Sequence, residues 1–133
     1  MEILCSVPKV SSLSFMRYLF ASLAKEKNVI IDKTGFVETI YNLREQIEPE
    51  SLYVFDDIEF RTGIDNIVSY DINAGINNLQ TLGIVGKLNP SYEKLIIYLT
   101  EKDADTILES CDPDVRNVFR KLAHSFEKRA ENG

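Results

Sequence analysis

Apolar residues recur at spacings of three and four along four segments of the chain, which predicts four amphipathic helices. The helices are expected over residues 12–27, 36–48, 70–82 and from residue 113 onward. Pro49 indicates that the second of them has ended by Glu48. The residues that define the four apolar faces are Leu13, Met16, Leu19, Phe20, Leu23 and Ala24; Phe36, Ile40, Leu43 and Ile47; Ile72, Ile76, Leu79 and Leu82; and Val115, Val118, Phe119, Leu122 and Phe126.

Short continuous apolar runs predict strands between these helices. Residues 29–31 form one run, residues 84–85 a second and residues 94–99 a third, and the turn-rich residues 86–91 are expected to form the tip of a hairpin. Residues 51–68 allow two interpretations. Either Leu52–Phe55 and Ile58–Phe60 are extended, with a turn at residues 61–63, or part of the segment packs irregularly under the following helix.

Several residues mark where helices begin and end. Ser69 and Thr100 are expected to cap helix N-termini, and Asp112 followed by Pro113 repeats this device before the last helix. Gly83 is placed to end the helix over residues 70–82 in the left-handed conformation that glycine adopts freely. The chain after Ser69 is therefore predicted to run helix, strand, hairpin tip, strand, helix, helix.

The chain length of 133 residues corresponds to a single domain, which we expect to be α+β and mostly helical. Cys5 and Cys111 lie far apart in the sequence, and this sparse cysteine content favours a reducing compartment. No apolar run approaches the roughly 20 residues that a membrane-spanning helix needs. The N-terminal stretch also lacks the pattern of a signal peptide. We therefore expect a cytoplasmic protein that does not act at a membrane.

The net charge is −6, and the acidic residues are concentrated between residues 36 and 112. Nucleic-acid affinity depends mainly on Lys and Arg side chains that neutralise phosphates. An acidic chain has no such built-in attraction, so the charge disfavours nucleic-acid binding.

Residues 76–108 resemble the second half of a winged helix-turn-helix domain. In that superfamily a helix ends in a Leu-x-x-Leu-Gly-Ile motif, which corresponds here to Leu79, Leu82, Gly83 and Ile84. A β-hairpin wing follows, and its second strand runs into a helix cap, here Leu99–Thr100. The resemblance implies a winged-helix-like domain over residues 1–133, with a small hairpin wing and extra N- and C-terminal helices.

Residues 36–85 are also distantly similar to Panacea-type antitoxins and related small prophage-encoded proteins. The corresponding pieces are Ile40–Tyr41 in a helix, a loop from Phe60 to Gly63, and the helix start at Ser69–Tyr70. This similarity implies a prokaryotic or phage protein with a regulatory role.

The chain departs from the regulator pattern in two respects. Some twenty residues separate Ile47 from Ser69, where a compact helix-turn-helix has only a few. The helix in the recognition position, Tyr70 to Leu82, contains no Lys or Arg, although Asn and Gln can contact adenine. The residues expected to contact a partner are Tyr70, Asn73, Asn77, Asn78, Gln80 and Thr81 on this helix and Lys87, Tyr92 and Lys94 on the wing.

A second candidate surface is basic and lies on the last helix. It consists of Arg116, Arg120, Lys121, Lys128 and Arg129, which form either a phosphate-binding face or, as we favour, the solvated side of an amphipathic helix. Tyr53, Tyr70 and Tyr92 are the aromatic residues outside the core spacing, and tyrosine is enriched at protein contacts.

Signatures of catalysis and of cofactor or metal binding are missing from the sequence. Asp56, Asp57 and Glu59 form an acidic cluster without the spacing of an EF-hand, and we interpret it as a solvated loop. His124 is the single histidine, and neither a phosphate-binding loop nor a nucleophile motif is present. We therefore expect no catalytic residues, no metal and no cofactor.

Two functions are compatible with these features. The first is a non-catalytic regulatory or adaptor module, antitoxin-like or anti-regulator-like. In it the acidic face from the middle of the chain contacts a basic protein partner or a second copy of the chain. The alternative is a dimeric DNA-binding transcriptional regulator in which the basic last helix and the wing lysines contact phosphates. The absence of Lys and Arg from the helix over residues 70–82 favours the first.

Overall fold

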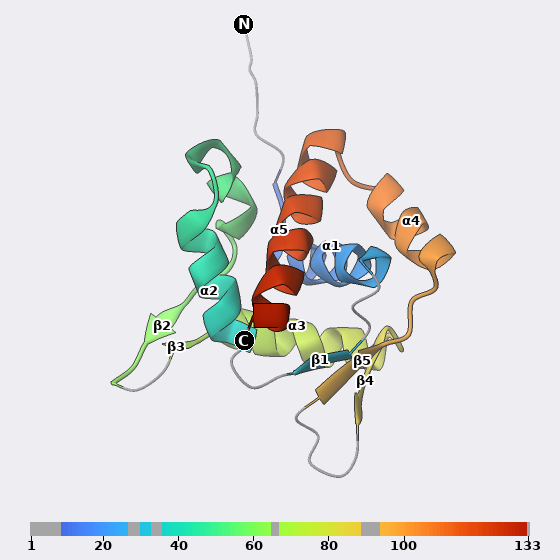
Figure 1. The fold of residues 1–133 in the computed structure, drawn as a ribbon, viewed down its shortest axis with the longest axis horizontal. Coiled ribbons are helices and arrows are strands. Elements are labelled where there is room, and N and C mark those ends of the chain that lie inside the picture. Colours follow the sequence, from blue (N-terminus) through green and yellow to red (C-terminus); the bar gives the residue numbers. More distant parts are fainter. Residues whose placement is uncertain (1–8, 27–29, 33–35, 65–66, 89–93, 133) are drawn as a thin grey trace, which may run out of the picture.

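The computed structural model describes residues 9–26, 30–32, 36–64, 67–88 and 94–132 (Figure 1). It is mostly helical with small antiparallel sheets, which confirms the predicted α+β class. The helices are α1 (Ser12–Lys25), α2 (Phe36–Gln46), the 3-10 helix η1 (Pro49–Phe55), α3 (Tyr70–Thr81), α4 (Glu101–Glu109) and α5 (Pro113–Asn132). The strands are β1 (Ile30–Asp32), β2 (Arg61–Thr62), β3 (Ile67–Val68), β4 (Val85–Leu88) and β5 (Lys94–Ile97).

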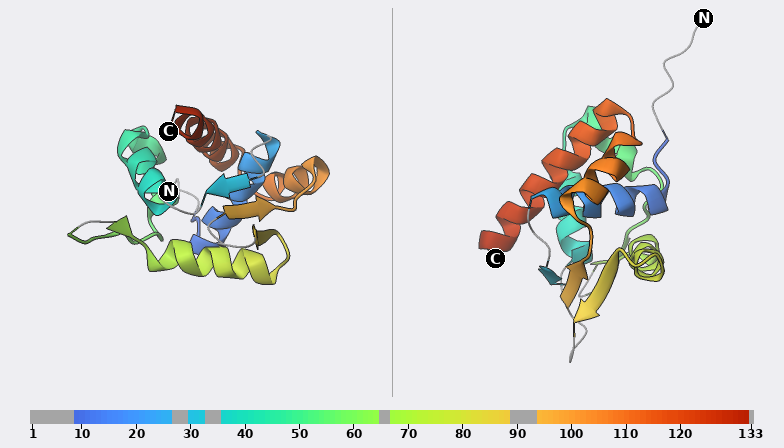
Figure 2. Two further views of the ribbon diagram at one scale, coloured as in Figure 1. Left: turned by 60° about the horizontal axis from the view of Figure 1, so that its bottom comes forward. Right: turned by 90° about the vertical axis from the view of Figure 1, so that its right-hand side faces the viewer.

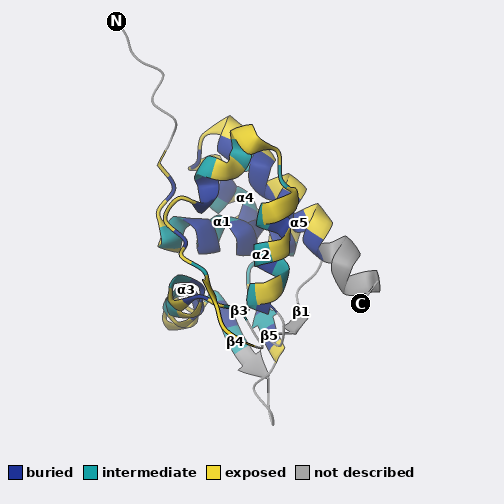
Figure 3. Ribbon diagram, turned by 90° about the vertical axis from the view of Figure 1, so that its left-hand side faces the viewer, coloured by how far each residue is buried: buried dark blue, intermediate teal, exposed yellow. Residues whose placement is uncertain are grey.

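Helix α1 lies at the centre of the core, in contact with α3, α4 and α5 (Figure 3). Its Phe15 ring packs 5.1 Å from the ring of Phe55 on η1 and 5.2 Å from that of Phe119 on α5. The sequence placed Leu13 on the buried face, but Leu13 is exposed and Phe15 is fully buried. A helix covered on several sides buries a broader band than one amphipathic face, which explains the burial of Phe15, whereas Leu13 lies in the first turn of α1.

The larger sheet has the strand order β1-β5-β4, and both pairings are antiparallel. Ile31 is opposite Leu95, and Val85 is opposite Ile97. The strand predicted over residues 29–31 is thus confirmed for its described part, and it lies beside the predicted hairpin. Strand β4 extends to Leu88, so residues 86–88 are strand rather than tip, because their backbone pairs with β5. Residues 89–91, the remainder of the predicted tip, lie outside the described residues.

The predicted helix caps are confirmed, whereas the helices predicted over residues 12–27 and 36–48 end earlier, at Lys25 and Gln46. The Ser69 hydroxyl accepts from the backbone N–H of Ile72 at 3.2 Å, and the Thr100 hydroxyl accepts from that of Asp103 at 3.1 Å. Asp112 caps α5 through Asp114 at 3.0 Å. Gly83 has a φ of 79°, and the N–H of Ile84 donates to the Leu79 carbonyl at 2.9 Å. This is the hydrogen bond that closes a helix with a left-handed glycine, and it directs the chain straight from α3 into β4.

The first interpretation of residues 51–68, in which two extended pieces precede a turn, was wrong. Residues 52–55 are not extended but belong to the 3-10 helix η1, which begins at Pro49 because proline suits a first helical position. The expected turn at residues 61–63 is instead largely strand β2, whose Arg61 is opposite Val68 on β3. The centroid of the Phe60 ring lies 5.2 Å from that of Tyr41, so the base of this hairpin packs against α2.

Helices α1 and α3 approach each other closely at one glycine. A Cβ atom on Gly75 would lie 2.3 Å from Cγ of Met16, and Met16 is fully buried. The absence of a side chain at Gly75 is therefore what allows α3 to pack against α1 at this distance.

We expect Gly75→Ala to lower the free energy of unfolding by up to about 2 kcal/mol. Overpacking a core costs roughly 1–3 kcal/mol, and the better helix propensity of alanine returns about 1 kcal/mol. Urea unfolding monitored by circular dichroism measures the difference. Gln80→Ala, at an exposed position of the same helix, is the control and should change little. A stabilised Gly75→Ala variant would show that the two helices are not tightly packed there.

Candidate interaction surface

Helix α3 packs on α1 and lies between the two hairpins of the fold (Figures 1 and 2). The β2–β3 hairpin is joined to its N-terminal end, and the β4–β5 hairpin follows its C-terminal end. The 12 residues of α3 correspond to a length of about 18 Å. The helix therefore separates the two hairpins and presents one long side to solvent.

The solvent-facing side of α3 carries no formal charge. Tyr70, Asn73, Asn77, Gln80 and Thr81 are exposed, in agreement with their predicted placement, whereas Asn78 is half-buried. Asp71 is the acidic residue of this helix; it is half-buried, and its carboxylate accepts a hydrogen bond from the backbone N–H of Glu59 at 2.8 Å.

The two ends of α3 expose apolar and aromatic side chains. Among the described residues, seven large hydrophobic side chains are exposed, and five of them lie at these ends or on the hairpin joined to the first. Val68 and Tyr70 are at the N-terminal end, where Tyr70 is 83% exposed, and Ile64, which is 101% exposed, lies beyond β2 toward the tip of the β2–β3 hairpin. Leu82 and Tyr98 are at the C-terminal end. We call these five residues, together with Asn73, Asn77, Gln80 and Thr81, the α3 surface.

Four residues of the α3 surface were not among the predicted contact residues. Leu82 had been assigned to the buried face of its helix, but it is the C-cap residue and is 54% exposed. Ile64, Val68 and Tyr98 depend on the hairpins for their exposure, and the sequence did not define the first hairpin. The exposure of Ile64 could have been predicted from its place directly after Gly63, because an apolar side chain in a turn has no core to enter.

The predicted wing residues divide into three cases. Lys94 is exposed at the start of β5. Lys87 lies on β4, opposite Leu95, and its side chain lies outside the described part. Tyr92 lies outside the described residues altogether.

The predicted basic face on α5 is partly committed to structural contacts. Arg116 is half-buried, and its guanidinium donates to the carbonyl oxygens of Leu108 at 3.0 Å and Cys111 at 3.4 Å. These contacts cap the C-terminal end of α4. Arg120 donates to Asn117 of its own helix at 2.8 Å, and Lys121 is exposed. Lys128 and Arg129 are on α5, with side chains outside the described part.

In the acidic cluster at residues 56–59, Asp57 makes a structural contact. The Asp57 carboxylate accepts from the backbone N–H of Ser12 at 2.6 Å and so satisfies the N-terminal end of α1. Asp56 and Glu59 are exposed, as expected for a solvated loop. Among the described residues, no group of three His, Cys, Asp or Glu side chains is arranged to hold a metal ion.

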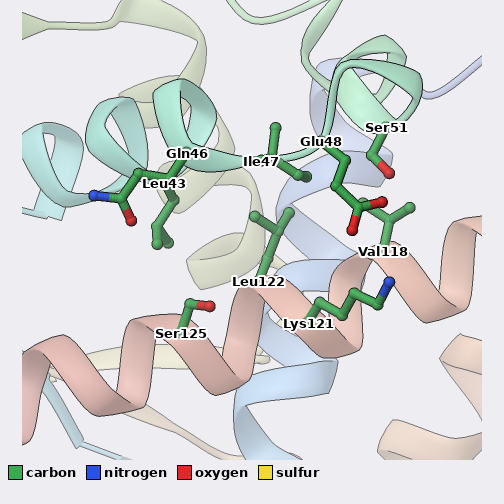
Figure 4. Close-up of a pocket in the computed structure, with 9 residues that line it drawn as sticks. All are labelled: Leu43, Gln46, Ile47, Glu48, Ser51, Val118, Lys121, Leu122 and Ser125. Atoms are coloured by element: carbon green, nitrogen blue, oxygen red, sulfur yellow. The ribbon is translucent and has the colours of Figure 1, made fainter.

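Several cavities lie away from the α3 surface. One of about 670 Å³ lies where residues 9–14 meet residues 53–57, with Tyr53, Asp56 and Asp57 in its lining. A groove of about 210 Å³ between α2 and α5 has an apolar floor with Glu48 and Lys121 beside it (Figure 4). The floor residues Leu43 and Leu122 are only 3% and 4% exposed, so they offer little apolar area to a ligand. A cleft of about 430 Å³ between α1, α4 and α5 is lined by charges, among them the ion pair of Lys25 and Asp105.

Cys111, Tyr53 and His124 are shielded by burial or have a local partner. Burial raises the pKa of the Cys111 thiol, which therefore stays protonated at neutral pH and is a poor nucleophile. Burial also raises the pKa of the Tyr53 hydroxyl, and the carboxylates of Asp114 and Asp112 add to this. His124 Nδ1 lies 3.1 Å from Glu26 Oε1 and ties α5 to the end of α1.

Replacing the α4-capping arginine should destabilise the fold. We expect Arg116→Met to lower the free energy of unfolding by about 1 kcal/mol, because the carbonyls of Leu108 and Cys111 lose the guanidinium hydrogen bonds. Arg120→Met is the matched control on the same helix and should stay within about 0.5 kcal/mol of the parent. Urea denaturation measures both, and equal stabilities of the two variants would contradict the capping role.

Comparison of the chain with protein-family models, with curated proteins and with solved structures gives no match. None of the described helices is long and apolar enough to cross a membrane.

Proposed function

We propose that this chain is a non-catalytic regulatory or adaptor module with a winged-helix-like architecture, and that it acts by protein–protein contact through the α3 surface. The architecture is supported by the order of α3, the Gly83 turn, the β4–β5 hairpin and α4. In this proposal the β4–β5 hairpin is the wing and α3 occupies the recognition position. An antitoxin-like or anti-regulator-like role is consistent with this arrangement.

The observation that carries the proposal is the composition of the α3 surface. A face without formal charge loses little hydration energy when a partner covers it, because buried unpaired charges are what make contacts costly. Exposed tyrosines such as Tyr70 and Tyr98 contribute strongly to protein interfaces. Exposed Ile64 and Val68 add apolar area that water covers unfavourably in the free chain.

The alternative function is a DNA-binding regulator, and one observation favours it. Asn73, Asn77 and Gln80 are exposed on the same helix, and their amides have the donor and acceptor pair that recognises adenine. Against this, the helix has no Lys or Arg, and Arg116 of the predicted basic face is engaged in capping α4. Phosphate contacts supply most of the affinity in such complexes, so we place protein contact first.

A photo-crosslinking residue in place of Asn77 tests the protein contact. With benzoylphenylalanine at position 77, irradiation of producing cells should yield a covalent adduct with a protein, identified by mass spectrometry. The same residue in place of Lys102, exposed on α4, is the control and should give no corresponding adduct. Loss of the adduct when Tyr70→Ala is added would tie it to the α3 surface. An adduct with nucleic acid, or none, would contradict the proposal.

Fluorescence anisotropy of labelled mixed-sequence duplex DNA distinguishes the two functions. We expect no binding by the purified chain even at low salt, because α3 offers no phosphate-neutralising side chain. Affinity that falls steeply as salt is raised would instead show phosphate contacts, and the regulator function would then take precedence.

A further inference from the structure

We infer that the cleft between α1, α4 and α5 binds a small zwitterion of the α-amino acid class. The cleft has a volume of about 430 Å³, which lies within the range of small-molecule sites. Its walls carry charges of both signs, and a buried hydroxyl among its lining residues has no hydrogen-bond partner in the described part of the chain. The site is separate from the α3 surface and is independent of the proposed function.

The hydroxyl of Ser22 is the observation that points to a ligand. Ser22 is only 3% exposed, lies within α1 and is among the residues that line the cleft. Its Oγ atom is buried and makes no hydrogen bond to any other described residue. Buried polar groups are nearly always hydrogen-bonded, because leaving such a bond unmade is costly. A polar molecule in the cleft would supply the partner that this hydroxyl lacks.

The charges of the cleft are divided between helices. Helix α5 contributes the guanidinium groups of Arg116 and Arg120, which are one helical turn apart. Helix α4 contributes the carboxylates of Asp105 and Glu109, which are likewise four residues apart. One wall is therefore basic and another is acidic, and α1 with Ser22 forms the third.

Some of these charges already have partners within the chain. Lys25 of α1 forms an ion pair with Asp105, and the Glu26 carboxylate lies 3.1 Å from the histidine of α5. Glu109 is exposed, and its carboxylate has no hydrogen-bond or ion-pair partner among the described residues. The Arg120 guanidinium donates to a neutral side-chain amide of its own helix. One carboxylate and one guanidinium of the cleft are thus without an opposite charge in the described part of the structure.

An α-amino acid matches these groups. Its carboxylate would accept hydrogen bonds from the Arg120 guanidinium and the Ser22 hydroxyl, and its ammonium group would donate to Glu109. A simple anion would leave Glu109 unpaired, and a simple amine would leave Arg120 unpaired. Among the described lining residues, Leu108 alone is apolar, and it is 7% exposed, which favours a ligand with a short or polar side chain.

An NMR titration of the isotope-labelled full chain tests this inference. Each standard amino acid is added in turn, and acetate and methylamine are the controls that carry a single charge. We expect at least one amino acid to shift the backbone amide signals of Ser22, Leu108 and Arg116 saturably. Neither acetate nor methylamine should do so at the same concentration, because each pairs with only one wall.

Variants on α5 and α1 locate the ligand. Arg120→Gln should weaken binding about tenfold to a hundredfold, because a hydrogen bond between charged groups is lost. Lys121→Gln removes the same charge at the neighbouring position, which does not line this cleft, and should bind as the parent does. Ser22→Ala should also weaken binding, while the free chain stays at least as stable because an unpaired buried hydroxyl is removed. The amide spectrum of each variant reports whether it is folded.

Three results would overturn the inference. These are the failure of every amino acid to shift the signals, equal binding of acetate, and an unchanged affinity in Arg120→Gln. None of them affects the photo-crosslink at position 77, so the proposed function is tested separately.

Discussion

The close packing of α3 on α1 is the contact on which the α3 surface depends. Met16 is fully buried directly against Gly75, and the absence of a side chain at Gly75 allows the two helices to approach. Helix α1 is in turn held by α4 and α5 and by the Phe15 aromatic contacts. The inner side of α3 is therefore held by buried packing contacts with α1, and its outer side faces solvent. A rigid surface loses less conformational entropy on binding than a mobile one.

Local sequence signals predicted much of the fold because the interactions behind them are local. Caps at Ser69 and Thr100 and the left-handed Gly83 join residues a few positions apart, so their residue types were sufficient. The segment between α2 and α3 was predicted poorly. Its conformation depends on partners distant in the sequence, such as Tyr41 against Phe60 and Ser12 against Asp57.

The residues of the α3 surface were likewise predicted only where the signal is local. The exposed polar residues of α3 could be predicted from helical spacing, since the apolar positions define the opposite side. The exposure of Ile64, Val68 and Tyr98 could not, because it depends on how two hairpins lie relative to the helix. Similarly, a list of basic residues on α5 gave no indication that Arg116 is engaged at the end of α4, eight residues back along the chain.

The hydrogen bond between Ser12 and Asp57 has a consequence for the order of folding. Its two residues are 45 positions apart, so forming it requires closure of a long loop, which is entropically costly and slow. The unit from α3 through β4 and β5 to α4 is built from neighbouring segments and needs only short loops to close. The α3 unit is therefore suited to form early, with the start of α1 secured late. In that sequence of events, α3 exists before the core beneath it is complete.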